Sequence, residues 1–204
     1  MKKSETFKKA IAAGIAIGIG ATVYLGIENR IIGAIMFCVG LFGICAFGMN
    51  LFTGKIAYVL ENKNYAELAI IWLGNLVGSF ICALPMRFIK PQLAETAVQL
   101  VSNKFAYDVL SLFVLSVLCG ILVYIAVDNF RNSSNDVSKV VGIFIAVPAF
   151  ILCGFEHSIA NMCYCIFGVT DLQTFGKAVV LVLVSTFGNG LGSIVFRWLI
   201  QTKK

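Results

Sequence analysis

One histidine stands beside a carboxylate inside a long apolar segment of this sequence. It is His157, which follows Glu156 in the run Gly154-Phe155-Glu156-His157. Charged or titratable groups are costly in apolar surroundings, so their presence there favours a functional site. An imidazole with an ordinary pKa of about 6.5 could pass a proton, or offer a positive charge, to a passing anion. A neutral histidine that is hydrogen-bonded inside the protein is the alternative, and the residues alone leave both open.

A second polar interruption, Leu51-Phe52-Thr53-Gly54, brings a hydroxyl that can donate or accept a hydrogen bond. The bulky apolar residues Leu51, Phe52 and Phe150 flank the two interruptions. Apolar collars around a small polar centre would strip water from an ion and reject large ions. Plain packing is the alternative for these side chains. Glu156 faces away from its neighbour His157, and we expect it to accept hydrogen bonds from backbone amides left free by the interruption.

The sequence predicts neither a metal site nor a bound cofactor. All seven cysteines fall inside apolar segments, and none of their spacings matches a zinc site, which favours buried small hydrophobic side chains. A membrane enzyme would need several reactive groups that converge on a substrate, and one histidine does not supply them. The net charge of +6 comes from basic residues spread over segment ends, which excludes a nucleic-acid-binding face.

The composition requires a membrane. Hydrophobic residues make up 59% of the 204 residues, charged residues only 13%, and the mean hydropathy is +0.92. A helix needs about 20 apolar residues to cross the hydrocarbon layer. This rule predicts a single all-helical domain, residues 1–204, with six spans at 7–25, 31–60, 65–88, 104–127, 137–168 and 175–200. Lipid is thus an expected partner.

An even number of spans places both termini on one side of the membrane. If that side is cytoplasmic, ten lysines and arginines of the connecting segments and ends lie inside and five outside, which fits the positive-inside rule. We therefore expect cytoplasmic N and C termini in a bacterial plasma membrane. Lys55 lies near the middle of the second segment, where its charge must reach water or be paired.

The chain contains a weak internal repeat. Leu73 to Phe80 and Phe187 to Ile194 share the frame Gly-Asn-x-x-Gly-Ser. Three spans per half would insert residues 1–100 and 101–204 with opposite orientations, and the long second and fifth spans would then hold matching interruptions. Interrupted helices in inverted repeats are typical of transport proteins. We expect the glycines to allow close helix packing, and Asn75 and Asn189 to form hydrogen bonds between helices.

These segments resemble the formate/nitrite transporter family. Residues 154–162 read GFEHSIANM, the family's hallmark run, and residues 51–54 read LFTG as in its second span. Residues 118–126, LCGILVYIA, resemble its fourth-span motif CNxLVCLA. The resemblance implies an aquaporin-like fold, a homopentamer with one pore per protomer, and small monovalent anions, such as formate, nitrite or hydrosulfide, as substrates.

The resemblance also implies roles for individual residues. The central histidine matches His157, the loop hydroxyl matches Thr53, and the family's lysine near the pore matches Lys104. It implies an outer constriction of Leu51 with Phe150, an inner one of Phe37 with Leu41, and support of the interruptions by Glu156, Asn161, Gly54 and Gly154.

Two positions depart from the family pattern. Gly120 stands where the family has an asparagine that holds the central imidazole, which predicts a hole beside His157. Lys55 follows LFTG where a neutral residue is usual, and we hypothesise that it reaches toward this hole and strengthens the field for anions. The sequence thus predicts a channel for small monovalent anions, with passage passive or linked to protons through His157. A pore for small neutral solutes is the alternative, although the Asn-Pro-Ala boxes of aquaporins are absent.

Overall fold

The computed structural model describes residues 3–201, and every regular element in this part of the chain is a helix, as predicted. The elements are α1 (Lys3–Gly26), α2 (Arg30–Ala46), α3 (Phe52–Lys55), the 3-10 helix η1 (Ile56–Tyr58), α4 (Val59–Asn62), α5 (Tyr65–Ile89), α6 (Pro91–Phe105), α7 (Val109–Asn132), α8 (Asp136–Leu152), α9 (Ser158–Gly168) and α10 (Leu172–Ile200). Lys2, Lys203 and Lys204, which entered the charge count above, lie outside the described residues.

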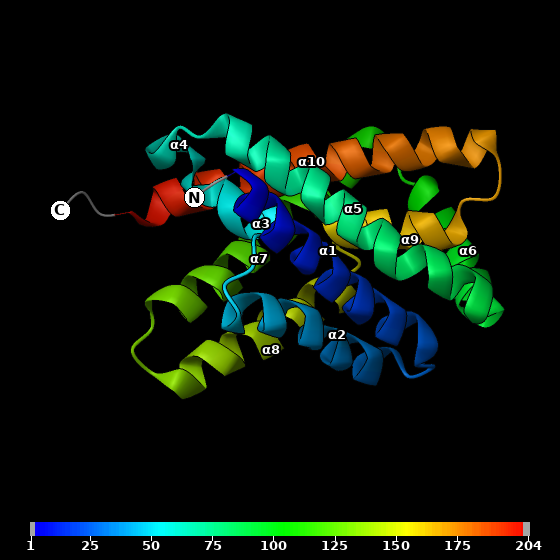
Figure 1. Cartoon of the computed structure of the whole chain (residues 1–204), viewed down its shortest axis with the longest axis horizontal. Coiled ribbons are helices and arrows are strands. Elements are labelled where there is room, and N and C mark those ends of the chain that lie inside the picture. Colours follow the sequence, from blue (N-terminus) through cyan, green and yellow to red (C-terminus); the bar gives the residue numbers. More distant parts are fainter. Residues whose placement is uncertain (1–2, 202–204) are drawn as a thin grey trace.

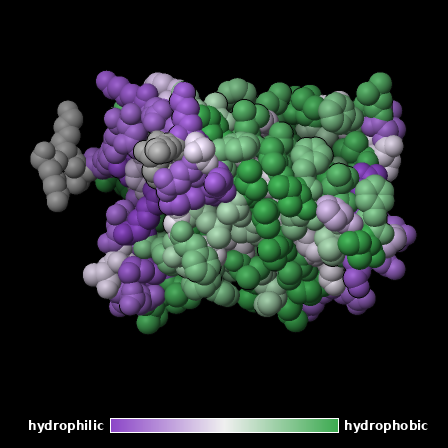
Figure 2. All heavy atoms as spheres, viewed as in Figure 1, coloured by the Kyte–Doolittle hydropathy of each residue, from purple (hydrophilic) through white to green (hydrophobic). Residues whose placement is uncertain are grey.

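Helix α10 runs along the longest axis of the molecule, and α1 and α5 run side by side at an angle to it (Figure 1). Among the described residues, α1, α5, α7 and α10 are long and apolar enough to cross a membrane. Hydrophobic residues form a broad band around the middle of the visible face, and hydrophilic residues gather at both ends (Figure 2). This distribution is expected of a protein that sits in a lipid bilayer. The start of α1 and the end of α10 lie toward the same end, at the left of Figure 1.

Helices α1 and α5, and likewise α7 and α10, touch through their backbones. A Cβ atom added to Gly78 of α5 would lie 2.1 Å from the carbonyl oxygen of Ile11 in α1. A Cβ atom on Gly192 of α10 would lie 2.1 Å from the carbonyl oxygen of Val117 in α7. Both glycines belong to the repeated Gly-Asn-x-x-Gly-Ser frame. Small residues there allow the close helix contact that the spacing predicts.

Two helices end in the middle of apolar segments. Helix α2 stops at Ala46, and the chain is not helical again until α3 begins at Phe52. Helix α8 stops at Leu152, and α9 begins at Ser158. The backbone reverses with positive φ at Gly48 (61°) and at Gly154 (70°), a conformation that favours glycine. Below, residues 47–51 are called the first break and residues 153–157 the second break.

Helix α6 is an element that hydropathy did not predict. The sequence placed Lys104 at the start of the fourth span, but Lys104 lies in the last turn of α6. Helix α7 begins only at Val109, where the Asp108 side chain accepts hydrogen bonds from the backbone N–H groups of Leu110 and Ser111. Helix α6 has a polar face and is shorter than a membrane crossing, so a search for long apolar runs passes over it.

The start of α10 is capped by an acidic side chain, as is the start of α7. The Asp171 carboxylate accepts a hydrogen bond from the N–H of Thr174, and the Thr174 hydroxyl accepts one from the N–H of Asp171. The pKa of Asp171 is lowered, chiefly by the hydrogen bond that its carboxylate accepts from the backbone N–H of Thr174. The reciprocal pair satisfies two N–H groups that would otherwise lack partners, which explains why α10 starts at Leu172.

Candidate functional site

One hydrogen bond in the interior joins α3, which follows the first break, to the second break. The Thr53 hydroxyl oxygen lies 3.0 Å from Nε2 of His157. Thr53 is 0% exposed and His157 is 3% exposed. Thr53 is the second residue of α3, and His157 is the residue before α9. The breaks thus bring together two polar side chains that are 104 positions apart in the sequence.

The other ring nitrogen of His157 determines which way this hydrogen bond points. The backbone N–H of Ala160 donates to Nδ1 at 3.1 Å, so Nδ1 must carry the lone pair. A neutral imidazole then has its proton on Nε2 and donates it to the Thr53 oxygen. The hydroxyl hydrogen of Thr53 is left available for another acceptor. His157 therefore caps α9 and orients Thr53 at the same time.

The first break is held by Asn75 of α5. Its side-chain oxygen accepts from the N–H of Phe52 at 2.9 Å. Its amide nitrogen donates to the carbonyl oxygens of Asn50, at 2.9 Å, and of Ala10, at 2.8 Å. Asn75 therefore ties the start of α3 to the chain two residues earlier and to α1.

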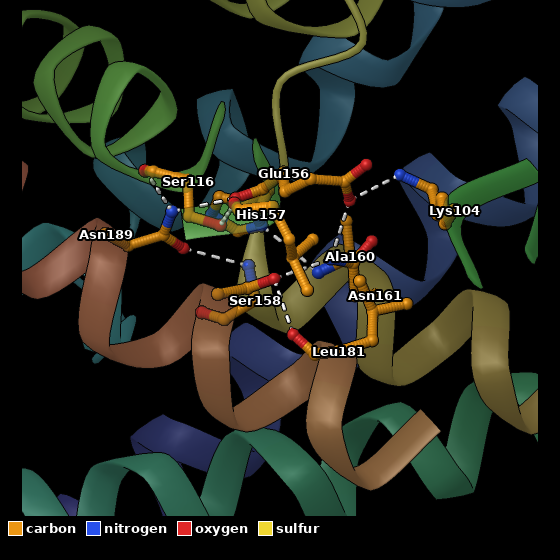
Figure 3. A network of polar contacts seen from close by, with 11 residues as sticks. Lys104, Ser116, Glu156, His157, Ser158, Ala160, Asn161, Leu181 and Asn189 are labelled. Atoms are coloured by element: carbon orange, nitrogen blue, oxygen red, sulfur yellow. Dashed lines mark hydrogen bonds and ion pairs between the residues drawn. The ribbon is translucent and has the colours of Figure 1, made fainter. Parts of the chain in front are cut away.

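The second break is held in the same way by Asn189 of α10. Its side-chain oxygen accepts from the N–H of Ser158 at 2.9 Å, and its amide nitrogen donates to the carbonyl oxygens of Glu156, at 2.8 Å, and Ser116, at 2.7 Å. Figure 3 shows Asn189 reaching across to Ser158 and Ser116. Both asparagines of the repeated frame thus form hydrogen bonds between helices, as the sequence predicts.

An ion pair lies on one side of His157. The Lys104 ammonium donates to the Glu156 carboxylate at 2.6 Å, and the amide of Asn161 donates to the same oxygen at 2.9 Å (Figure 3). The side chain of Glu156 is 1% exposed and that of Lys104 is 11% exposed. The prediction that the Glu156 side chain binds backbone amides is wrong, because a lysine and an asparagine satisfy it. A second contact of the Asn161 amide is the Ser185 hydroxyl, at 3.0 Å.

Aromatic rings cover the imidazole. The Phe150 ring is stacked on His157, with ring centres 5.7 Å apart and planes 17° apart. The edge of Phe37 meets the Phe150 ring at 6.2 Å. Phe37 and Leu41 are buried on α2. The constrictions of Leu51 with Phe150 and of Phe37 with Leu41 stay predictions, and the contact of Phe37 with Phe150 joins one residue of each pair.

Two cavities with different lining residues lie near the contact between Thr53 and His157. The first, which we call the Lys104 cavity, has a volume of about 70 Å³ and is lined by Lys104, Arg30, Phe150, Gly154, His157, Asn161 and others. The second, the Arg131 cavity, has about 230 Å³ and is lined by Ile44, Cys45, Gly48, Met49, Leu51, Gly54, Lys55, Val127, Phe130 and Arg131. Leu51 thus lines one cavity and Phe150 the other.

The mouth of the Lys104 cavity lies under α6. A cavity of about 1070 Å³ shares Tyr24, Arg30 and Leu100 with it and is lined on one side by Gln92, Thr96, Gln99 and Asn103 of α6. These four polar residues recur at helical spacing, so one face of α6 forms a polar wall. Sequence reasoning missed both this wall and Arg30. The spacing of the polar residues in 92–103 was the signal that could have revealed the wall.

The hole expected beside His157 does not exist. A Cβ atom on Gly120 would lie 2.2 Å from the backbone oxygen of Asn189. The backbone of α10 therefore occupies the space into which an asparagine at this position would extend. Lys55 lines the Arg131 cavity, and Gly120 is not among the residues of that cavity. The hypothesis that Lys55 reaches toward space left by Gly120 is wrong for this physical reason.

Comparison with known proteins adds a family assignment to this geometry. The sequence model of the family described as "Formate/nitrite transporter" matches residues 1–202. The formate channel FocA of Escherichia coli (strain K12) is 28% identical over an alignment of 182 positions, and the alignment covers 78% of this chain and 64% of FocA. The nitrite transporter NirC of the same strain is 28% identical over an alignment of 211 positions, gaps included, and the alignment covers 90% of this chain and 77% of NirC. The chain thus spans less than two thirds of the length of FocA.

Solved structures share the fold. A chain described as an FNT family ion channel superposes with a TM-score of 0.87 at 25% identity, over 97% of this chain and 89% of the other. A pentameric formate channel with formate bound superposes with a TM-score of 0.78 at 24% identity, over 97% and 93% of the two chains.

Proposed function

Because this chain belongs to the formate/nitrite transporter family, we propose that it is a membrane channel for small monovalent anions. Formate and nitrite are the first candidates, because two relatives carry those names, and hydrosulfide is a third candidate of similar size and charge. One observation carries the proposal for this chain. Two cavities lined by cationic side chains lie near one buried contact: His157 lines the Lys104 cavity, and Leu51 and Gly54, close to Thr53 in the chain, line the Arg131 cavity.

The proposed architecture has six membrane crossings. Helices α1, α5, α7 and α10 are four of them, α2 with α3 to α4 forms a fifth, and α8 with α9 forms the sixth. The matching hydrogen bonds of Asn75 and Asn189 support a relation between the two halves as inverted repeats. The matching contacts of Gly78 and Gly192 support it as well. Non-helical backbone at membrane depth is tolerated where it lines a cavity, which fits both breaks.

In this mechanism an anion loses most of its water before it reaches the centre. Phe150 and Phe37 close the path from the Lys104 cavity, and Leu51 closes it from the Arg131 cavity. Between these collars the Thr53 hydroxyl, whose oxygen accepts from the His157 Nε2–H, replaces part of the lost hydration by donating its free hydrogen to the anion. A dry site strengthens these hydrogen bonds, since the effective dielectric constant there is lower than in water.

His157 works as a neutral donor in this proposal. A proton that moved from Nε2 to a formate ion would leave an imidazolate, unless Nδ1 gained a proton at the same time. Nδ1 accepts from the Ala160 N–H, so a proton there would set two donors against each other. The neutral ring avoids both states. Lys104 contributes less positive field than its position suggests, because Glu156 compensates its charge, and Arg30 supplies the cation of that cavity.

Uptake into proteoliposomes tests the function. The purified chain is expected to carry labelled formate, with nitrite and hydrosulfide as competitors, and to leave uptake of glycerol at the level of protein-free liposomes. Glycerol flux without formate flux would instead identify a pore for neutral solutes. His157→Asn keeps an N–H donor and removes the titratable ring. Its formate flux should fall but keep the wild-type pH profile, and loss of the pH dependence would assign a proton role to His157.

Assembly and orientation complete the proposal. We expect a homopentamer in a bacterial plasma membrane, with both termini in the cytoplasm. A solved structure of similar fold is described as pentameric. The common end of α1 and α10 supports termini on one side, and the excess of lysine and arginine there supports the cytoplasm.

A further inference from the structure

Two cationic side chains line the Arg131 cavity. Lys55 is the last residue of α3, directly after Gly54, and Arg131 lies in the last turn of α7. Lys55 is half-buried, whereas Arg131 is exposed. The cavity has about 230 Å³, and its wall also contains Leu51. The two charges therefore line the same cavity as Leu51, which the proposed mechanism makes a constriction.

Neither cation is neutralised by a nearby acid. Within residues 3–201, no carboxylate oxygen lies within 4.0 Å of the charged nitrogens of Lys55 or Arg131. Lys104 on the other side of His157 is the contrast, because Glu156 holds it. The positive charges of Lys55 and Arg131 repel each other, and the cavity screens this repulsion less than bulk water does. An anion bound between them would offset the repulsion and stabilise both charged side chains.

The acids near this cavity are occupied elsewhere. Asp128 accepts from the Tyr58 hydroxyl at 2.7 Å and from Arg197 at 3.5 Å. Glu61 is bound by two nitrogens of Arg197. Glu67 shares a separate cavity of about 90 Å³ with Lys55, and its oxygens accept from Asn64 and Thr6. None of the three is a wall residue of the Arg131 cavity.

An aromatic ring holds the side chain of Arg131 in place by contacting the face of its guanidinium. Its guanidinium carbon lies 4.9 Å from the ring centre of Tyr58, a cation–π contact. None of the ion pairs within residues 3–201 includes Arg131, so its guanidinium keeps N–H groups that can bind a ligand. A guanidinium offers a planar pair of donors, which matches the two oxygens of a carboxylate or of nitrite.

We propose that the Arg131 cavity is an anion-binding site, in which Lys55 and Arg131 together hold a small monovalent oxyanion next to Leu51. The site rests on the proposed channel function and gives that channel a loading position on the side opposite to the Lys104 cavity. The chemistry selects an anion with two coplanar oxygens, such as formate or nitrite, over a spherical ion.

Single-channel currents in planar bilayers test the site, because the formate concentration can be varied on each side separately. Lys55→Gln and Arg131→Gln should each raise the half-saturating formate concentration about three- to tenfold, corresponding to about 0.7–1.4 kcal/mol, on one side only. Lys63→Gln is the matched control, since it removes a cation from the connection after α4, outside the cavity. The control should leave both sides unchanged.

Cys45 offers a second readout that does not depend on transport. It lines the same cavity and carries a free thiol. In a variant whose other six cysteines are replaced by alanine or serine, a negatively charged methanethiosulfonate should react faster with Cys45 than a positively charged one. Lys55→Gln and Arg131→Gln should each lower this rate ratio severalfold, and formate or nitrite should protect the thiol better than chloride.

The outcomes separate the site from the channel function. Formate currents in the wild type, with half-saturation and Cys45 rates unchanged in both variants, would overturn the site and leave the channel standing. An absence of formate currents, together with intact protection of Cys45 by formate, would overturn the channel function and leave the site. Equal changes in half-saturation on both sides would also contradict the proposal, because they indicate a general surface-charge effect.

Discussion

At the scale of single residues, the buried pair of Lys104 and Glu156 is the group most sensitive to substitution. Its carboxylate is bound by an ammonium and an amide, and it has almost no contact with solvent. Removing one partner of a buried pair leaves an uncompensated charge, which costs about 3–5 kcal/mol, whereas replacing both partners together costs far less. An unpaired Glu156 would also leave an uncompensated negative charge beside Asn161, a wall residue of the Lys104 cavity, and repel anions.

We therefore predict that Lys104→Met abolishes formate flux and lowers the thermal unfolding temperature of the purified protein. The double variant Lys104→Met/Glu156→Gln should recover most of the stability and a large part of the flux. Proteoliposome uptake and unfolding in detergent measure the two effects on the same preparations. A double variant as inactive as Lys104→Met would mean that Lys104 acts on the anion directly.

Residue types in the sequence singled out His157 and Thr53, which the structure brings into contact, but not the residues around them. The run of residues 154–162 pointed to His157, and the structure places Thr53 against it. The sequence did not predict the ion-pair partner of Glu156, because Lys104 lies 52 positions away, on a helix that hydropathy does not reveal. The role of Gly120 was misjudged for a related reason, since the backbone of another helix fills the space beside it.

At the scale of helices, the contact between α7 and α10 depends on the absence of a side chain at Gly120. We predict that Gly120→Ala lowers the free energy of unfolding by about 1–3 kcal/mol, because its Cβ atom would overlap the backbone of Asn189. Gly120→Asn, which restores the usual family residue, should destabilise the protein further and should not increase flux.

Gly176→Ala is the control for this prediction, because it lies in α10 and nothing approaches within 4 Å of its added Cβ. Alanine favours a helix by up to about 1 kcal/mol over glycine, so this variant should be neutral or more stable. Chemical or thermal unfolding in detergent compares the three variants. Equal stability of Gly120→Ala and Gly176→Ala would show that α7 and α10 can separate without cost.

A second contact between helices joins α4 to the end of α10. Hydrogen bonds from Gln201 and Arg197 lower the pKa of Glu61. Because the folded-state pKa is lowered, the contact stabilises α4 above the ordinary carboxylate pKa of about 4.3 and is lost as the pH falls through the lowered value. Hydrogen exchange in residues 56–62 should thus accelerate on acidification, relative to the intrinsic exchange rate.

Arg197→Gln should produce the same acceleration at neutral pH, because it removes the guanidinium that binds Glu61 through two nitrogens. Lys139→Gln is its control, since it breaks a surface pair with Asp136 at the start of another helix. Protection that is equal in all three proteins would mean that α4 is held by its apolar contacts alone.

At the scale of the whole molecule, the sequence predicted an all-helical membrane protein, because both properties follow from composition and from the length of apolar runs. The close pairing of α1 with α5 and of α7 with α10 could be expected from the repeated glycines of one frame. The two cavities could not, because each is lined by segments that lie far apart in the sequence. Their positions depend on how the breaks turn the chain, and hydropathy carries no information on that direction.

The location of both cavities within one chain leads to a prediction about the assembly. If five copies of the 22.1-kDa chain associate and each carries its own path, one inactive protomer should remove only its own share of the flux. Pentamers assembled from mixtures of wild type and the inactive Lys104→Met test this, provided that native mass spectrometry shows both chains in the same assemblies. Formate flux should then fall in proportion to the fraction of Lys104→Met protomers. A pore shared by all five chains would instead make flux fall far more steeply, because a single inactive protomer would impair the whole assembly.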